Sequence, residues 1–135
     1  MPHLVIISET GFPHSACLLD YSAARREWYG FHPKRSRSPA GAGEVDRSDR
    51  TAFINHYIRF QVSVARLDDA VAKIRSKYEG GTYAVGVKDC VSLSADVAYE
   101  CGLRVPYVNF TPYGLIKILQ LYNSPTEVDV QPLPW

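Results

Sequence analysis

The order of its hydrophobic patterns constrains the fold of this chain more than any other feature, because strand patterns come first and helical patterns follow. Four segments have strand character: 4–8, 14–20, 27–31 and 53–64. The last of these alternates apolar and polar residues cleanly, and we expect it to be the longest strand. Helical spacing then appears in three segments: 67–78, 90–101 and 111–123. This order predicts an α+β domain in which helices pack against an antiparallel sheet.

Capping residues define the ends of two of the helices. Asp89 is the expected N-cap of the helix that starts at Cys90, and Gly102 is its stop signal. Thr111 and Pro112 open the last helix in the same way, as N-cap and first helical residue. Segment 34–50 combines glycine, proline, serine and basic residues, so we expect a mobile loop that borders the functional site. The tail 124–135 has no packing pattern except for Trp135, a candidate for docking back.

Length, charge and cysteine content limit the functional classes. A chain of 135 residues with 46% hydrophobic content and a net charge of +1 forms one domain, 1–135, and its neutral charge argues against nucleic acid as a partner. It has no apolar run of membrane-spanning length, so no stable membrane insertion is expected, and no signal peptide is recognisable. We expect synthesis in the cytoplasm, and any export would use a leaderless route. The three cysteines are an odd number without metal-ligand spacing, so no metal site is expected. Cys90 and Cys101 lie about three helical turns apart, too far for a disulfide, so no structural disulfide is expected either.

Cys90 is the candidate nucleophile. It is the first residue of the helix that Asp89 caps, and the unpaired N–H groups and dipole of a helix start stabilise a thiolate. The alternative is a small core residue on the apolar stripe of the helix, which is how we interpret Cys17 and Cys101.

The segment Asp89-Cys90-Val91-Ser92-Leu93 resembles the Asp-Cys-Ser-Gly-Leu/Phe-Val signature of NlpC/P60 and related papain-like peptidases and amidases. Asp89, Cys90 and Leu93 match, whereas Val91 and Ser92 depart from Ser-Gly. All four histidines precede Cys90, which excludes the ordinary order of this family and leaves its circularly permuted branch, including LRAT-like and YiiX-like proteins. Segment 11–19 is similar to the histidine-bearing turn and strand of that branch. The resemblance implies a permuted papain-like fold with the nucleophile helix packed against the antiparallel sheet.

This resemblance makes His14 the expected base, at the start of a strand on the rim of the sheet. A surface turn histidine is the alternative. His32, at the end of the next strand, is the candidate third catalytic residue or else an exposed loop-edge residue. His56 lies on the apolar face of its strand and is a second candidate, or a satisfied core histidine. His3, next to the terminus, has no expected role.

The resemblance implies a cysteine hydrolase that cleaves amide or peptide bonds, and this chemistry requires neither a metal nor an organic cofactor. Peptidoglycan peptides are the expected substrate, in a design similar to secreted antibacterial amidase effectors, for which an immunity protein would be a partner. Two alternatives stay open: an LRAT-like thiol acyltransferase or lipid hydrolase, and a non-catalytic papain-like binding module.

Overall fold

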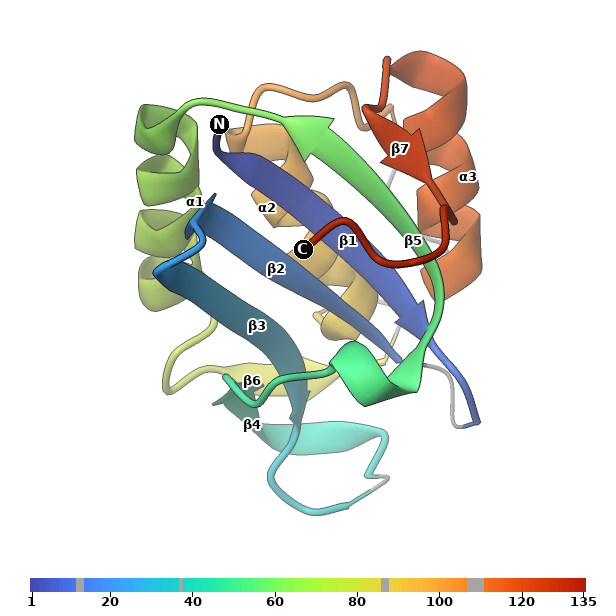
Figure 1. Cartoon of the computed structure of the whole chain (residues 1–135). Coiled ribbons are helices and arrows are strands. Elements are labelled where there is room, and N and C mark those ends of the chain that lie inside the picture. Colours follow the sequence, from blue (N-terminus) through green and yellow to red (C-terminus); the bar gives the residue numbers. More distant parts are fainter. Residues whose placement is uncertain (12–13, 37, 86–87, 107–110) are drawn as a thin grey trace.

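A computed structural model describes residues 1–11, 14–36, 38–85, 88–106 and 111–135. Within these ranges the chain forms a seven-stranded sheet in the order β6-β4-β3-β2-β1-β5-β7, with three α-helices (Figure 1). The strands are β1 (His3–Glu9), β2 (Ser15–Ser22), β3 (Arg25–Pro33), β4 (Ala40–Asp46), β5 (Ile54–Gln61), β6 (Thr82–Ala84) and β7 (Glu127–Val128), and the helices are α1 (Val64–Lys77), α2 (Cys90–Glu100) and α3 (Pro112–Tyr122). All strand pairs are antiparallel, so the predicted α+β class with an antiparallel sheet is confirmed.

The predicted helix starts are confirmed by their caps. The Asp89 carboxylate accepts a hydrogen bond from the Ser92 N–H, while the Ser92 hydroxyl accepts one from the Asp89 N–H, which together form a capping box. The Thr111 hydroxyl accepts from the N–H of Gly114 and starts α3 at Pro112. These caps fix the residue at which α2 begins, and therefore the position of Cys90.

The strand predicted over 53–64 is shorter than expected. β5 ends at Gln61, because Ser63 caps α1 by accepting a hydrogen bond from the N–H of Arg66 and so draws Val64 into the helix. At eight residues β5 is shorter than β3, which has nine, so its predicted rank as the longest strand was wrong.

Segment 34–50 is not simply a loop, because it contains β4, which pairs with β3 on one side and β6 on the other. Gly43 contributed to the prediction of a loop, but it allows β4 to lie against β3. A Cβ atom at this position would lie 2.2 Å from Cζ of Phe31, so the glycine lets the Phe31 ring lie against the β4 backbone.

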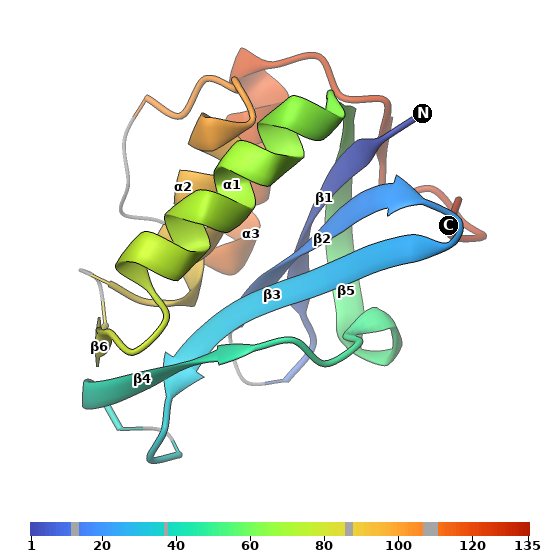
Figure 2. The same cartoon turned by 90° about the vertical axis from the view of Figure 1, so that its left-hand side faces the viewer.

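Apolar side chains pack on both faces of the sheet. The larger cluster lies between the sheet and the helices and includes Cys17 and Cys101, both buried as predicted. The other face carries a smaller cluster that includes Tyr57, against which Trp135 packs edge to face with ring centroids 5.1 Å apart. Docking of Trp135 is therefore confirmed. Figure 2 shows the helices on one side of the sheet and the C terminus on the other.

None of the helices among the described residues is long and apolar enough to cross a membrane.

Candidate active site

Cys90, His14 and His32 line one cavity of about 530 Å³. Each comes from a different element: Cys90 is the first residue of α2, His14 immediately precedes β2, and His32 lies near the end of β3. The antiparallel pairing of β2 with β3 brings the start of one strand next to the end of the other, and α2 packs across both. The structure therefore brings together the three residues that the sequence singled out.

The start of β2 holds Cys90 against the sheet. The hydroxyls of Ser15 and Ser94 are hydrogen-bonded at 2.8 Å, and both side chains are fully buried. Ser94 lies one helical turn after Cys90, and Ser15 directly follows His14. This bond therefore links the segment that carries the candidate base to the helix that carries the candidate nucleophile.

The expectation that the helix start ionises Cys90 was wrong. Burial raises the pKa of its thiol to about 11, because only 7% of the residue is exposed to solvent. Backbone N–H groups of Ser15, Val91 and Cys90 itself lower the pKa, and the charge of Asp89 raises it. The increase in pKa caused by burial is larger than the decrease caused by the N–H groups at the helix start, so the thiol is protonated near neutral pH.

His14 is a mostly buried residue rather than a surface turn histidine, since 16% of its side chain is exposed. Its Nε2 lies 3.8 Å from Oε2 of Glu9, and the ring packs on the backbone of Gly30, where a Cβ atom would be 3.2 Å from Nε2. Burial lowers the pKa of His14; the Glu9 charge opposes this effect, whereas Arg50 adds to it. His14 is therefore a neutral imidazole near neutral pH.

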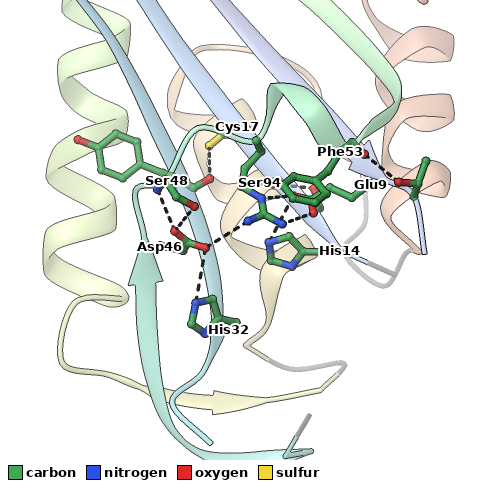
Figure 3. Close-up of polar contacts among 12 residues, drawn as sticks. Glu9, His14, Cys17, His32, Asp46, Ser48, Phe53 and Ser94 are labelled. Carbon is green, nitrogen blue, oxygen red and sulfur yellow. Dashed lines mark hydrogen bonds and ion pairs between the residues drawn. The ribbon is translucent and has the colours of Figure 1, made fainter. Parts of the chain in front are cut away.

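His32 lies in the same cavity with different partners. Its Nδ1 is 3.0 Å from the carbonyl oxygen of Pro33, and its Nε2 is 3.6 Å from Oδ2 of Asp46. Figure 3 shows His14 and His32 with the carboxylates of Glu9 and Asp46 beside them. The ring of His32 is half-exposed, so it reaches the cavity from the rim.

His56 lies away from this cavity, on β5. Its Nδ1 is 3.0 Å from Oδ2 of Asp129, and its ring stacks on Tyr113 with centroids 4.1 Å apart. It was expected to point into the core, but its side chain is one-third exposed. The pairing of β5 with β7 involves only Ile58 and Arg59, so at His56 the strand is covered by the side chains of Asp129 and Tyr113, which leave part of the ring exposed.

A buried acid and its arginine were missed by the sequence analysis. The Glu9 side chain is 4% exposed, and both of its oxygens accept hydrogen bonds from Arg50, at 2.9 and 2.6 Å. Arg50 also lies 3.9 Å from Asp46. A glutamate at the end of an apolar strand is the only sequence signal for this arrangement, since a buried carboxylate needs a cationic partner.

The rest of the cavity wall comes largely from segment 34–50, which borders the site as predicted. Lys34, Ser36 and Ser38 supply polar groups, and Phe53, Tyr83 and Val85 supply apolar surface. A cavity of this size is within the range of ligand-binding pockets, about 300–1,000 Å³. Among the described residues, no group of histidine, cysteine and acidic side chains is arranged to hold a metal ion.

No protein-family model, curated protein or solved structure matches this chain. The functional assignment therefore rests on the cavity and on the side chains that line it.

Proposed function

We propose that this protein is a cysteine hydrolase that cleaves amide or peptide bonds, with Cys90 as nucleophile and His14 as general base. The observation that carries the proposal is the convergence of a helix-start cysteine and a mostly buried, neutral histidine on one cavity, from two distant parts of the chain. A structural cysteine needs neither a cavity nor a nearby base. Cys17 is an example, since it lies fully buried in the core and does not line the cavity of Cys90 and His14.

The chemistry follows from two neutral partners rather than a preformed ion pair. His14 accepts the thiol proton as the Cys90 sulfur attacks the substrate carbonyl carbon, and N–H groups at the start of α2 stabilise the oxyanion. The C–N bond then breaks, and the imidazolium gives its proton to the leaving amine. Water, deprotonated by His14, cleaves the resulting thioester, releasing the carboxylic acid and restoring the thiol.

The permuted NlpC/P60 fold and a peptidoglycan substrate are part of this proposal, supported by the resemblance of 11–19 and 89–93 and by the chain order of His14, His32 and Cys90. Peptide stems of the bacterial cell wall are then the substrate class. Toxicity toward competing cells, with an immunity protein as partner, would follow for an exported form.

An LRAT-like thiol acyltransferase or lipid hydrolase is the second candidate. Two large apolar side chains on the cavity wall favour it, because Phe53 is 45% and Val85 is 61% exposed. Such side chains could contact acyl chains, and Lys34 on the wall of the same cavity could contact a lipid phosphate.

The test compares the wild type with Cys90→Ala and, as a matched control, Cys17→Ala. Peptide release from isolated cell-wall sacculi and fatty-acid release from phospholipid vesicles are measured beside thermal melting. We expect release from sacculi that Cys90→Ala abolishes and Cys17→Ala retains. Activity confined to vesicles would select the lipid alternative, and equal activity in folded Cys90→Ala would contradict the nucleophile role. If the wild type cleaves neither substrate but still binds to sacculi or to vesicles, the non-catalytic binding module is favoured.

A further inference from the structure

We propose that Glu9 is the positioning residue for His14: it holds the proton on Nε2, so that Nδ1 keeps its lone pair for the Cys90 thiol. The catalytic consequence of this arrangement rests on the proposed function, whereas the proton position itself does not. The assignment differs from the one expected from sequence, in which His32 or His56 filled the third place.

The first observation is that Glu9 is a buried charge held in a defined orientation. The Nε of Arg50 donates to Oε2 and a terminal nitrogen donates to Oε1, which fixes the carboxylate plane. Taking a carboxylate out of water carries a large desolvation cost, which a cationic partner offsets only when the geometry is good. Packing alone does not require an acid at this place, where β1 ends beside the cavity.

The second observation is the orientation of the His14 ring. Its Nε2, not its Nδ1, approaches the Glu9 carboxylate, at 3.8 Å. The backbone ties the two residues as well, because the N–H of Glu9 donates to the carbonyl oxygen of His14 at 3.0 Å. The missing side chain of Gly30 leaves room for Nε2. Hydrogen bonds of catalytic groups are often long before substrate binds and tighten in the complex, so a shift of under about 1 Å completes this one.

The third observation concerns the competing candidate. Both ring nitrogens of His32 face other groups, Nδ1 the carbonyl of Pro33 and Nε2 the carboxylate of Asp46. Each histidine therefore has its own carboxylate near Nε2: Asp46 for His32 and Glu9 for His14. Arg50 lies between the two carboxylates and forms an ion pair with each, at 2.6 Å from Glu9 and 3.9 Å from Asp46.

The charges that face His14 come from several elements. Glu9 of β1 and Asp46 of β4 favour its protonation, while Arg50, after β4, and His32 of β3 oppose it. Removing the Glu9 charge leaves only the more distant Asp46 carboxylate to offset the charge of Arg50 near the ring. We therefore expect Glu9→Gln to lower the pKa of His14 further, and to shift the acidic limb of any His14-dependent rate profile to lower pH.

The experiment records long-range ¹H–¹⁵N spectra of the full chain labelled on histidine, which distinguish a protonated ring nitrogen from a bare one. In the wild type and in Cys90→Ala we expect a proton on Nε2 and none on Nδ1 of His14. Glu9→Gln should populate the other tautomer, because an amide both donates and accepts. Glu9→Asp, which keeps the charge, should retain the wild-type tautomer in part. Asp46→Asn is the matched control, since it removes the carboxylate beside His32 and should leave the His14 tautomer unchanged.

Turnover on sacculi gives the functional readout. Glu9→Gln should reduce kcat by roughly 10²-fold, the lower end of what a general base contributes, with KM little changed. A wild-type proton on Nδ1, or an unchanged tautomer in folded Glu9→Gln, would overturn the proposal; if Glu9→Gln does not fold, the wild-type spectrum decides. An Nε2 proton in a protein without any hydrolytic activity would support the positioning by Glu9 while contradicting the hydrolase.

Discussion

The rate at which Cys90 is alkylated should rise steadily between pH 6 and about 11, without a plateau near neutral pH. The thiolate is the reactive form, and burial holds the pKa of this thiol at about 11, above its ordinary value of 9.0. A helix-start cysteine that was already ionised would instead show a constant rate from about pH 7 upward.

The magnitude follows from the difference between the two pKa values. At pH 7 a thiol of pKa 9.0 is about 10⁻² ionised, and one of pKa about 11 is about 10⁻⁴ ionised. Cys90 should therefore react roughly a hundredfold more slowly at pH 7 than an ordinary thiol. The difference corresponds to about 2.7 kcal/mol, at 1.36 kcal/mol for each unit.

Iodoacetamide labelling followed by peptide mapping reads Cys90 separately from Cys17 and Cys101. The same protein unfolded in urea provides the reference rate for an ordinary thiol at each pH. A plateau that begins below pH 8 would refute the reasoning, because it would mean that the backbone N–H groups and His14 together outweigh burial. If His14→Ala removed such a plateau, Cys90 and His14 would form an ion pair in the resting protein.

Three further predictions concern the surroundings of the site. Gly30→Ala places a methyl group 3.2 Å from Nε2 of His14, so the ring must move by a few tenths of an ångström; turnover should fall roughly tenfold while the melting temperature changes little. Ser94→Ala leaves the Ser15 hydroxyl buried without its partner and should lower the free energy of unfolding by about 1–3 kcal/mol in urea titrations, whereas the double variant Ser15→Ala/Ser94→Ala should recover part of the loss. Because the folded pKa of Cys90 is raised, its stabilising contribution is present below about pH 9 and is lost as the pH rises through about 11. Between pH 9 and pH 11, Cys90→Ala should therefore lose less stability than the wild type, by about 2 kcal/mol. Parallel urea titrations at both pH values measure this loss. If burial had not shifted the pKa of Cys90, the free energy of unfolding would change by the same amount between the two pH values in both proteins.

Local sequence signals predicted the elements that carry the site. Asp89 and Thr111 marked the helix starts correctly because a cap acts on N–H groups two or three residues away, so its effect is visible within a short segment. Short motifs also singled out Cys90 and His14, through their resemblance to a known family, and the two residues line the same cavity. Their catalytic roles stay predictions.

Features that depend on distant parts of the chain could not be predicted in this way. Gly43 indicated a loop because the Phe31 ring that requires it comes from another strand. The Glu9–Arg50 pair joins residues 41 positions apart, and neither residue belongs to a recognisable motif. The pKa of Cys90 was misjudged since the helix start is local, whereas the burial that outweighs it is produced by packing of the whole domain.

The hydroxyl pair of Ser15 and Ser94 also determines when during folding the site can form. Its members are 79 residues apart, so closing this contact costs more loop-closure entropy than pairing strands that are neighbours in the sequence. Strands β1, β2 and β3 can pair through short connections beforehand, and they position His14 and His32 before the Cys90 thiol arrives. The thiol joins them only when α2 docks. A chain that is still folding, or that has locally released α2, would therefore carry the candidate base without its nucleophile, and any activity of Cys90 would be restricted to the fully folded protein.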